Sequence, residues 1–393
     1  MKKLSILKLS TLVLITGLAF NSCQKDDETT DNSREILEDK VIENYANLVY
    51  ENYLQSYNDA VSLETAINAF IANPDQTLFD NAKNAWKTAR ESYGTTEAFR
   101  FIDGPIDDAN GPEALLNSWP LDENYIDYVN GAVNSGIIND LVTYPNITKT
   151  LLVDLNAIDE ANETNVSVGY HAIEFLLWGQ DLTIPSANLA GQRQYTDYVD
   201  GGTAANQNRR RQYLSICADL LTDHLDYLVD QWKPNGTYRN QFVSLNNKTA
   251  ITKIFTGAIV LVYSELAVER VSTALYNQDQ EDEHSCFSDN THRDVRLNLK
   301  GVINVYKGTY GSVAGESLED LVNSVNTTAA NDTSNAITDA VSKTNATLIP
   351  FDLAIANGPT SIEGAKVKSA FDAMQLLGSN LKAGAEKLGI TIQ

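Results

Sequence analysis

Positive charge is scarce in this sequence of 393 residues. Lys and Arg together number 29, against 52 Asp and Glu, and the formal net charge is −23. A protein that binds the phosphates of DNA or RNA needs a basic surface, so this balance argues against a nucleic-acid partner. An acidic surface instead raises the local concentration of cations.

Cysteine is equally rare, with Cys23, Cys217 and Cys286 as its three occurrences. Cys23 ends the leader segment described below, so Cys217 and Cys286 are the two that can pair inside a fold. An oxidising compartment permits a disulfide between them, but the sequence does not require one. The pairing therefore stays open.

Two further patterns are missing. The first is the alternation of apolar and polar residues that is typical of a β-strand. The sequence instead has apolar residues that recur at three- and four-residue steps, as over residues 36–54, and no alternating stretch is as regular as this helical pattern. This periodicity predicts an all-α fold. The sequence also has no His-Glu-x-x-His segment, the helical zinc motif of many metallopeptidases.

Residues 1–22 have the three parts of a signal peptide. A start with three lysines precedes an apolar stretch over residues 11–20, and small polar residues stand before Cys23. The apolar stretch is too short for a spanning helix, which needs roughly 20 residues. We predict cleavage before Cys23 and attachment of lipid to this cysteine, so that the membrane is a partner through the anchor.

The polar, acidic residues 23–33 have the composition of a flexible tether. Within them, the Lys25-Asp26-Asp27 run resembles the surface-export signal of bacterial lipoproteins. We therefore expect an outer-membrane lipoprotein exposed at the cell surface, with a periplasm-facing orientation as the alternative.

The length of the remaining chain predicts two domains. About 370 residues exceed what one hydrophobic core usually organises. Each half holds two long helical segments, an acidic loop and further helices, so we expect two bundles of similar topology. Gly201-Gly202-Thr203 is the predicted boundary, with an N-terminal bundle over 34–203 and a C-terminal bundle over 204–393.

The stretch SVGYHAIEFLLWGQD, residues 167–181, is the most informative for chemistry. His171 and Glu174 are three residues apart and therefore neighbours on one helical face. Their helix is apolar on nearly every side and is expected to be buried, which is costly for both groups unless they are paired. The two side chains can ligate one metal ion, or they can bond to each other and tie helices together.

A second stretch aligns five large side chains at spacings of 4, 3, 4 and 3 on one helical face, namely Trp86, Arg90, Tyr93, Glu97 and Arg100. This face is either an ion-pair seam between helices or the wall of a cleft. The turn that follows presents Asp103. A third stretch, the loop over residues 281–294, mixes acids with His, Cys and Ser, and is either a solvated loop or part of a site.

The segment from Gly169 to Glu174 matches the GxHxxE motif of the imelysin family, and the segments over residues 85–107 and 281–294 also resemble family blocks. The resemblance implies a two-domain helical fold with a pocket between the domains, on an exported protein tied to iron uptake. It implies that Gly169, His171 and Glu174 are the motif residues of this chain. It also implies that further residues face the same pocket: Glu97, Arg100, Asp103, Glu283, Ser285, Asp289 and His292.

Three functions are consistent with these residues. The first is a non-catalytic, metal-binding component of iron uptake that works with iron-transport proteins, in which His171 and Glu174 bind iron, zinc or copper and Glu97 or Asp289 completes the ligand shell. The second is a zinc peptidase, which needs three protein ligands and a base that this sequence does not offer. The third is a binder of a peptide or haem-like ligand on the aromatic residues.

Overall fold

The computed structural model describes residues 26–156 and 162–392. The predicted signal peptide and the lipidation site at Cys23 lie outside the described residues. Helix α1 spans Asp26–Ala72, so it begins within the segment for which the sequence predicts a flexible tether. No Gly or Pro interrupts residues 26–72, and a polar segment continues a helix that its neighbours have already nucleated.

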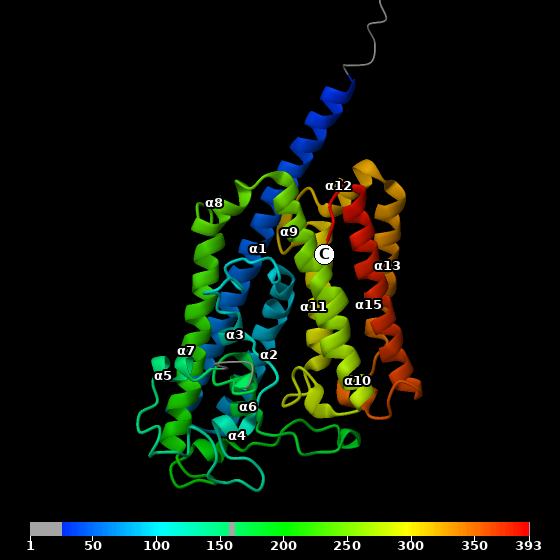
Figure 1. The fold of residues 1–393 in the computed structure, drawn as a ribbon. Helices are drawn as coiled ribbons and strands as arrows, with labels where there is room; N and C mark the ends of the chain where they lie inside the picture. The colour runs from blue at the N-terminus through cyan, green and yellow to red at the C-terminus, as the bar shows by residue number, and fades with distance from the viewer. Residues whose placement is uncertain (1–25, 157–161, 393) are drawn as a thin grey trace, which may run out of the picture.

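The first helical group is built on three long helices that lie side by side (Figure 1). Helix α1 packs along both α2 and α7. Short elements fill the region between α2 and α7. The members of this group are α2 (Gln76–Thr96), η1 (Glu97–Phe99), α3 (Glu113–Leu116), α4 (Glu123–Ile126), α5 (Lys149–Asp154), α6 (Tyr170–Trp178), η3 (Pro185–Ala187), η4 (Tyr195–Tyr198), α7 (Gln207–Trp232) and α8 (Thr237–Val243).

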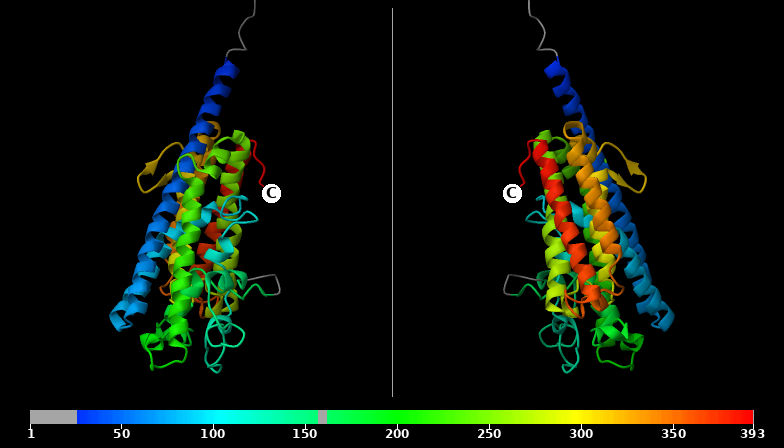
Figure 2. Two further views of the ribbon diagram at one scale, coloured as in Figure 1. Left: turned by 90° about the vertical axis from the view of Figure 1, so that its left-hand side faces the viewer. Right: turned by 90° about the vertical axis from the view of Figure 1, so that its right-hand side faces the viewer.

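The second group packs around α15 and runs alongside the first in both side views (Figure 2). A two-stranded antiparallel hairpin pairs Thr309 with Ala314 and Tyr310 with Val313. The members are α9 (Asn247–Val260), η5 (Leu261–Ser272, a π-helix), α10 (Thr273–Asn277), η6 (Gln280–Asp282), α11 (Thr291–Lys307), β1 (Thr309–Tyr310), β2 (Val313–Ala314), α12 (Leu318–Val325), α13 (Thr327–Asn345), α14 (Phe351–Ile355) and α15 (Ile362–Lys387). The all-α prediction is confirmed.

The predicted boundary at residue 203 lies just before α7. Helix α7, assigned by that boundary to the C-terminal bundle, packs on α1 and contacts α6. Its partners are long-range, and a glycine-rich turn before the helix carries no information about them. By its contacts α7 packs with the first helical group.

One of the contacts between the two groups is the packing of α2 against α11. A Cβ atom at Gly94 of α2 would lie 2.8 Å from Cβ of Leu297, and one at Gly301 of α11 would lie 2.5 Å from the carbonyl oxygen of Thr95. Both distances are shorter than real contacts allow. Glycine at these two positions lets the helices approach closely enough to share buried polar groups.

Burial within the fold describes the two remaining cysteines and the most apolar helical stretch. Cys217 and Cys286 are both buried and free. Among the described residues, one helical stretch, Asn247–Asn277, is long and apolar enough to cross a membrane, and 56% of its most apolar window is buried. This stretch forms α9, η5 and α10 and packs against α11 and α15, as the core helix of a bundle does.

The loop-rich region of the first group is held by a buried carboxylate. Asp127 accepts hydrogen bonds from Nη1 of Arg193 at 2.6 Å and from Nε and Nη2 of Arg210 at 2.7 and 2.8 Å. All three side chains are nearly inaccessible to water. Because this one carboxylate accepts from both guanidinium groups, it joins the α4 region to α7.

We expect Asp127→Ala to lower the free energy of unfolding by about 3–5 kcal/mol, since it removes the carboxylate that both buried cations share and leaves Arg193 with Asp197 at 3.8 Å and Arg210 with backbone carbonyls. Chemical denaturation followed by circular dichroism measures this loss. Asp200→Ala is the matched control: its side chain is 81% exposed and pairs with Arg211 at the surface, so its effect should stay within about 1 kcal/mol. Equal losses of unfolding free energy in the two variants would contradict the stabilising role of Asp127.

Candidate functional site

Two glycines set the position of α6. Gly169 precedes the helix with φ of 91°, and Gly179 follows it with φ of 69°. A Cβ atom at Gly169 would lie 2.7 Å from the carbonyl oxygen of Leu116. The motif glycine is therefore required both for its backbone conformation and for its close contact with the end of α3.

His171 and Glu174 bond to each other within the buried helix. Nδ1 of His171 lies 3.0 Å from Oε2 of Glu174. The other carboxyl oxygen, Oε1, accepts hydrogen bonds from the backbone NH of Ser288 at 3.0 Å and from its hydroxyl at 2.7 Å. The pair thereby connects α6 to the loop before α11.

Burial decides the protonation of this pair. It raises the pKa of Glu174 to about 8, against the opposing hydrogen bonds from Ser288. It also lowers the pKa of His171 well below its usual value, an effect that the neighbouring His284 reinforces. Both side chains are therefore neutral near pH 7. Nε2 of His171 is buried without a hydrogen-bond partner among the described residues.

His284 is the closest aromatic neighbour of His171. The two rings have centroids 4.6 Å apart, and the ring of Trp119 lies 5.1 Å from His171. Nδ1 of His284 is 3.1 Å from Oδ2 of Asp294. Burial, followed by the charge of Arg270, lowers the pKa of His284 to about 4, so this imidazole is also neutral.

Asp294 is the charged centre of the arrangement. Its carboxylate lies 2.9 Å from Nη2 of Arg90 and accepts a 2.5 Å hydrogen bond from the Ser285 hydroxyl. Burial acts to raise the pKa of Asp294, but Arg90 and His284 hold it well below its usual range. Asp294 thus stays ionised and orients the groups around it.

A chain of hydrogen bonds continues from Arg90 to Glu97. Nη1 of Arg90 donates to Asn117 at 2.5 Å, and the Asn117 amide donates to Glu97 at 3.3 Å. Glu97 in turn accepts from Arg100 at 2.8 Å and from Arg270 at 2.7 Å. Burial opposes its ionisation, yet the two arginines lower the pKa of Glu97 to about 2.

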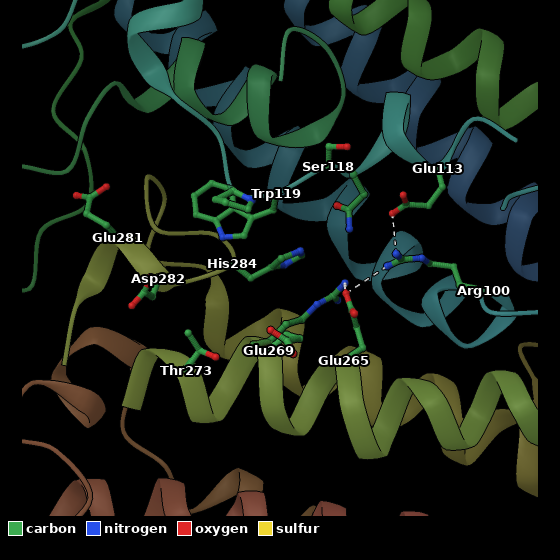
Figure 3. Close-up of a pocket in the computed structure, with 13 residues that line it drawn as sticks. Arg100, Glu113, Ser118, Trp119, Glu265, Glu269, Thr273, Glu281, Asp282 and His284 are labelled. Carbon is green, nitrogen blue, oxygen red and sulfur yellow. Dashed lines mark hydrogen bonds and ion pairs between the residues drawn. The ribbon is translucent and has the colours of Figure 1, made fainter. Parts of the chain in front are cut away.

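A cleft of about 350 Å³ opens on this chain between the two helical groups (Figure 3). Its described lining includes five carboxylates, two guanidinium groups, an imidazole and an indole, from Glu113, Glu265, Glu269, Glu281, Asp282, Arg100, Arg270, His284 and Trp119. The carboxylates outnumber the guanidinium groups. The described walls of the cleft are therefore negatively charged, and they lead inward to His284 beside His171.

The π-helix η5 forms one wall of the cleft. Nη2 of Arg270 lies 2.9 Å from Oε1 of Glu265, five residues earlier. Residues five apart point in different directions on an α-helix, whereas the i→i+5 hydrogen bonding of a π-helix brings them together. The wider winding therefore places this ion pair, together with Glu269, along the cleft.

The structure does not bring all of the predicted pocket residues together. Arg100 lines the cleft, and Arg90, Glu97 and Ser285 belong to the chain behind it. Trp86 and Tyr93 instead pack in the core. The indole NH of Trp86 donates to the carbonyl of Tyr170 at 2.9 Å, and the ring of Tyr93 lies 4.7 Å from that of Tyr170.

The remaining predicted residues lie elsewhere. Asp103 is exposed at a turn with φ of 53°. Nδ1 of His292 lies 3.1 Å from the backbone carbonyl of Asp289, and none of Glu283, Asp289 and His292 lines the cleft. The resemblance identified their loop, but it could not show which faces of the loop the side chains occupy.

Sequence reasoning missed several cleft residues. Glu265, Glu269 and Arg270 stand in the apolar segment after Ile251, and charged residues in such a helix are the same signal that identified His171. Asn117 and Trp119 follow a short helix and carry no comparable pattern. The association of His284 with His171 is a tertiary contact across more than a hundred residues.

The described residues do not form a complete site for a resident metal. They contain no group of three or more His, Cys, Asp or Glu side chains placed to hold one ion. Glu174 uses both oxygens in hydrogen bonds, and Glu97 is paired with two arginines. The free Nε2 of His171 suits a ligand, but a catalytic zinc needs three protein ligands.

The raised pKa of Glu174 gives stability a defined pH dependence. A buried acid with a raised pKa contributes fully below its unfolded value of 4.5, and the contribution is lost as pH rises towards about 8. We expect Glu174→Gln, which stays neutral, to lose less unfolding free energy than wild type over this range. Urea denaturation at several pH values measures this, with the exposed Glu386→Gln as control. Identical profiles for Glu174→Gln and wild type would contradict the shift.

The comparisons with known proteins agree with this fold and motif. The chain is 26% identical over 284 residues to iron-regulated protein A of Synechococcus elongatus, a match that covers 69% of this chain and 65% of the relative, slightly under two thirds of its length. The solved structure of an iron-regulated protein A precursor from Parabacteroides distasonis has a TM-score of 0.68 at 19% identity. This likeness covers 90% of this chain and 95% of that chain and supports the fold.

The family is established by a match to most of the chain. The family model described as imelysin, peptidase family M75, matches residues 49–377. These bounds include the GxHxxE motif, both walls of the cleft and the loop that carries His284. The protein belongs to the imelysin family.

Proposed function

We propose that this protein is a membrane-anchored lipoprotein of the imelysin family that binds iron as cargo in the cleft and contributes to iron uptake without catalysing a reaction. The observation that carries the proposal is the acidic lining between the two helical groups. Five carboxylates there face two arginines, and such a concave surface of one charge attracts cations.

The donor types in the cleft also suit iron. The carboxylates from η5 and the loop around η6 are exposed or partly exposed, whereas the His284 imidazole in the same lining is buried. Mixed nitrogen and oxygen donors are compatible with iron, zinc or copper. Because the described residues hold no preformed set of three ligands, the captured iron retains water or a small chelator as its further ligands.

The names of the relatives support the link to iron. Both matched relatives are named as iron-regulated protein A. For localisation, we propose an anchor at Cys23 in the outer membrane with the fold facing outward, and iron-transport components as partners. Helix α1 extends beyond the packed helices (Figure 1), which would hold the cleft away from an anchored N-terminus.

We expect the double variant Glu265→Gln and Glu269→Gln to bind iron at least about tenfold more weakly, or ~1.4 kcal/mol, because it removes two negative charges from the cleft. Titration calorimetry with Fe²⁺ without oxygen, and with ferric citrate, measures this on the mature chain carrying Cys23→Ser. Glu386→Gln on α15 is the control for charge alone, since it is exposed and does not line the cleft. Equal affinity in all three proteins would refute cleft binding.

His171 makes a separate prediction, because its Nε2 is free of hydrogen bonds to described residues and its ring lies beside that of His284. We expect His171→Ala to weaken iron binding while Ser215→Ala, a change at a half-buried residue of α7 that does not line the cleft, leaves it intact. Metal analysis after equilibrium dialysis gives the stoichiometry of each variant. Unchanged stoichiometry and affinity in His171→Ala would remove His171 from the binding site. Cleavage of an unfolded protein that a chelator and Glu174→Ala both abolish would instead support a peptidase.

A further inference from the structure

A second cavity, of about 390 Å³, lies in the loop-rich part of the first helical group. It is formed by two loops, residues 128–133 and residues 179–193, and it shares no lining residue with the cleft between the groups. The backbone NH of Asn130 donates to the side-chain oxygen of Gln180 at 2.8 Å and ties the two loops together. The volume is in the range of cavities that hold small molecules.

The described lining of this cavity combines apolar side chains with one charged group. Val129, Val133 and Leu182 supply apolar surface, and Arg193 is the one charged residue among the described lining residues. Val133 and Leu182 are 71% and 63% exposed, whereas Arg193 is 8% exposed. A ligand here therefore meets apolar side chains that are open to solvent and a guanidinium group that is largely buried.

The guanidinium group of Arg193 has hydrogen-bonding capacity that the described fold does not use. Nη1 donates to Asp127 at 2.6 Å. Nε is buried without a partner, and no hydrogen bond joins Nη2 to a described residue. The rings of Tyr128 and Phe175 lie 5.0 and 5.1 Å from the guanidinium carbon and pack against the group. Buried donors without an acceptor are costly, so this side chain lacks an acceptor that a ligand can supply.

Nε and Nη2 form one edge of the guanidinium plane, and the same edge binds carboxylates elsewhere in this chain. Arg210 donates from Nε and Nη2 to Asp127 at 2.7 and 2.8 Å. Arg293 uses the same two atoms to bind both oxygens of Glu91. Two parallel N–H groups match the two oxygens of a carboxylate. The free edge of Arg193 therefore suits a carboxylate.

Gly179 keeps this edge free of side-chain atoms from α6. A Cβ atom at Gly179 would lie 3.4 Å from Nε of Arg193, and both residues line the cavity. The φ of 69° at Gly179 also belongs to the left-handed region that favours glycine. The backbone at the end of α6 thus leaves room beside the guanidinium group.

The charges around Arg193 allow one further anion. Asp127 and Asp197 stand against Arg193 and Arg210, so these four groups balance. Burial opposes the charge of Arg193, but Asp127 holds its pKa above the ordinary value. The guanidinium group therefore stays charged in the presence of a bound carboxylate.

We propose that this cavity binds a small apolar carboxylate, with its two oxygens on the Nε–Nη2 edge of Arg193 and its apolar body against Val133 and Leu182. A free organic acid and the C-terminal residue of a peptide with an apolar side chain offer this same chemistry. Binding leaves the bond from Nη1 to Asp127 in place. The site is separate from the iron-binding cleft and does not depend on the function proposed for it.

Titration calorimetry of the mature chain with Cys23→Ser tests the proposal without iron. Benzoate represents the free acid and N-acetyl-glycyl-leucine the peptide terminus, and benzamide and the C-terminal amide of the peptide are their neutral controls. We expect at least one carboxylate to bind at one per chain with Kd on the order of 1 mM or tighter. Its amide should bind at least about tenfold more weakly. The carboxylate that binds more tightly identifies the source.

Three variants locate the site. Val133→Glu adds a negative charge to the lining and should weaken carboxylate binding by about tenfold or more. Val142→Glu is the matched control, since Val142 is 92% exposed and does not line the cavity, and it keeps the wild-type affinity. Arg193→Lys keeps a cation for Asp127 but lacks the planar fork, so it should lose carboxylate binding while circular dichroism shows an intact fold.

Two results overturn the proposal. The first is the absence of binding by either carboxylate, or equal affinity for each carboxylate and its amide. The second is equal affinity in Val133→Glu and Val142→Glu, which would place the ligand outside this cavity. The double variant Glu265→Gln and Glu269→Gln keeps the carboxylate affinity even if it loses iron, so failure of one proposal is distinguishable from failure of the other.

Discussion

The buried ion pair between Arg90 and Asp294 is the interaction on which the rest of the site depends. Arg90 lies on α2 of the first helical group and Asp294 on α11 of the second, and both side chains are 1% exposed. Asp294 holds His284 and Ser285, and Arg90 holds Asn117. Loss of either partner would leave a charge unpaired in the interior at a cost of about 3–5 kcal/mol. The same ion pair therefore holds the chain of polar side chains in place and joins the two helical groups.

The close approach of the two helices makes this ion pair possible. Gly94 and Gly301 allow backbone and side chains from α2 and α11 to touch without an intervening Cβ. Asn298 uses the same approach, since its amide donates to the carbonyl of Gly94 at 2.9 Å and its oxygen accepts from Arg270. Small residues at the contact thus let large polar residues meet just beside it.

Local patterns predicted the fold class and the central motif, because both follow from short-range physics. Three- and four-residue periodicity identified the helices, and a polar pair in an apolar helix identified His171 and Glu174. Spacing could not decide between a shared metal and a direct hydrogen bond. That choice depends on Ser288, which occupies the second oxygen of Glu174 from a loop more than a hundred residues away. Likewise, Trp86 and Tyr93 share a helical face with Arg90, but only tertiary packing shows that this face meets α6 rather than solvent.

The winding of η5 has a consequence for sequence variation in the family. A π-helix accommodates more residues per turn than an α-helix, so the stretch from Leu261 to Ser272 is sensitive to length. Residues five apart are about 140° apart around an α-helix, whereas residues four apart face each other. Removing one residue between Glu265 and Arg270 and restoring α-helical winding would therefore keep this ion pair, whereas α-helical winding at the present length would separate its partners. A homologue one residue shorter between these two positions would keep the same cleft wall without a π-helix, so an alignment gap there marks a change of winding rather than a change of ligand or fold.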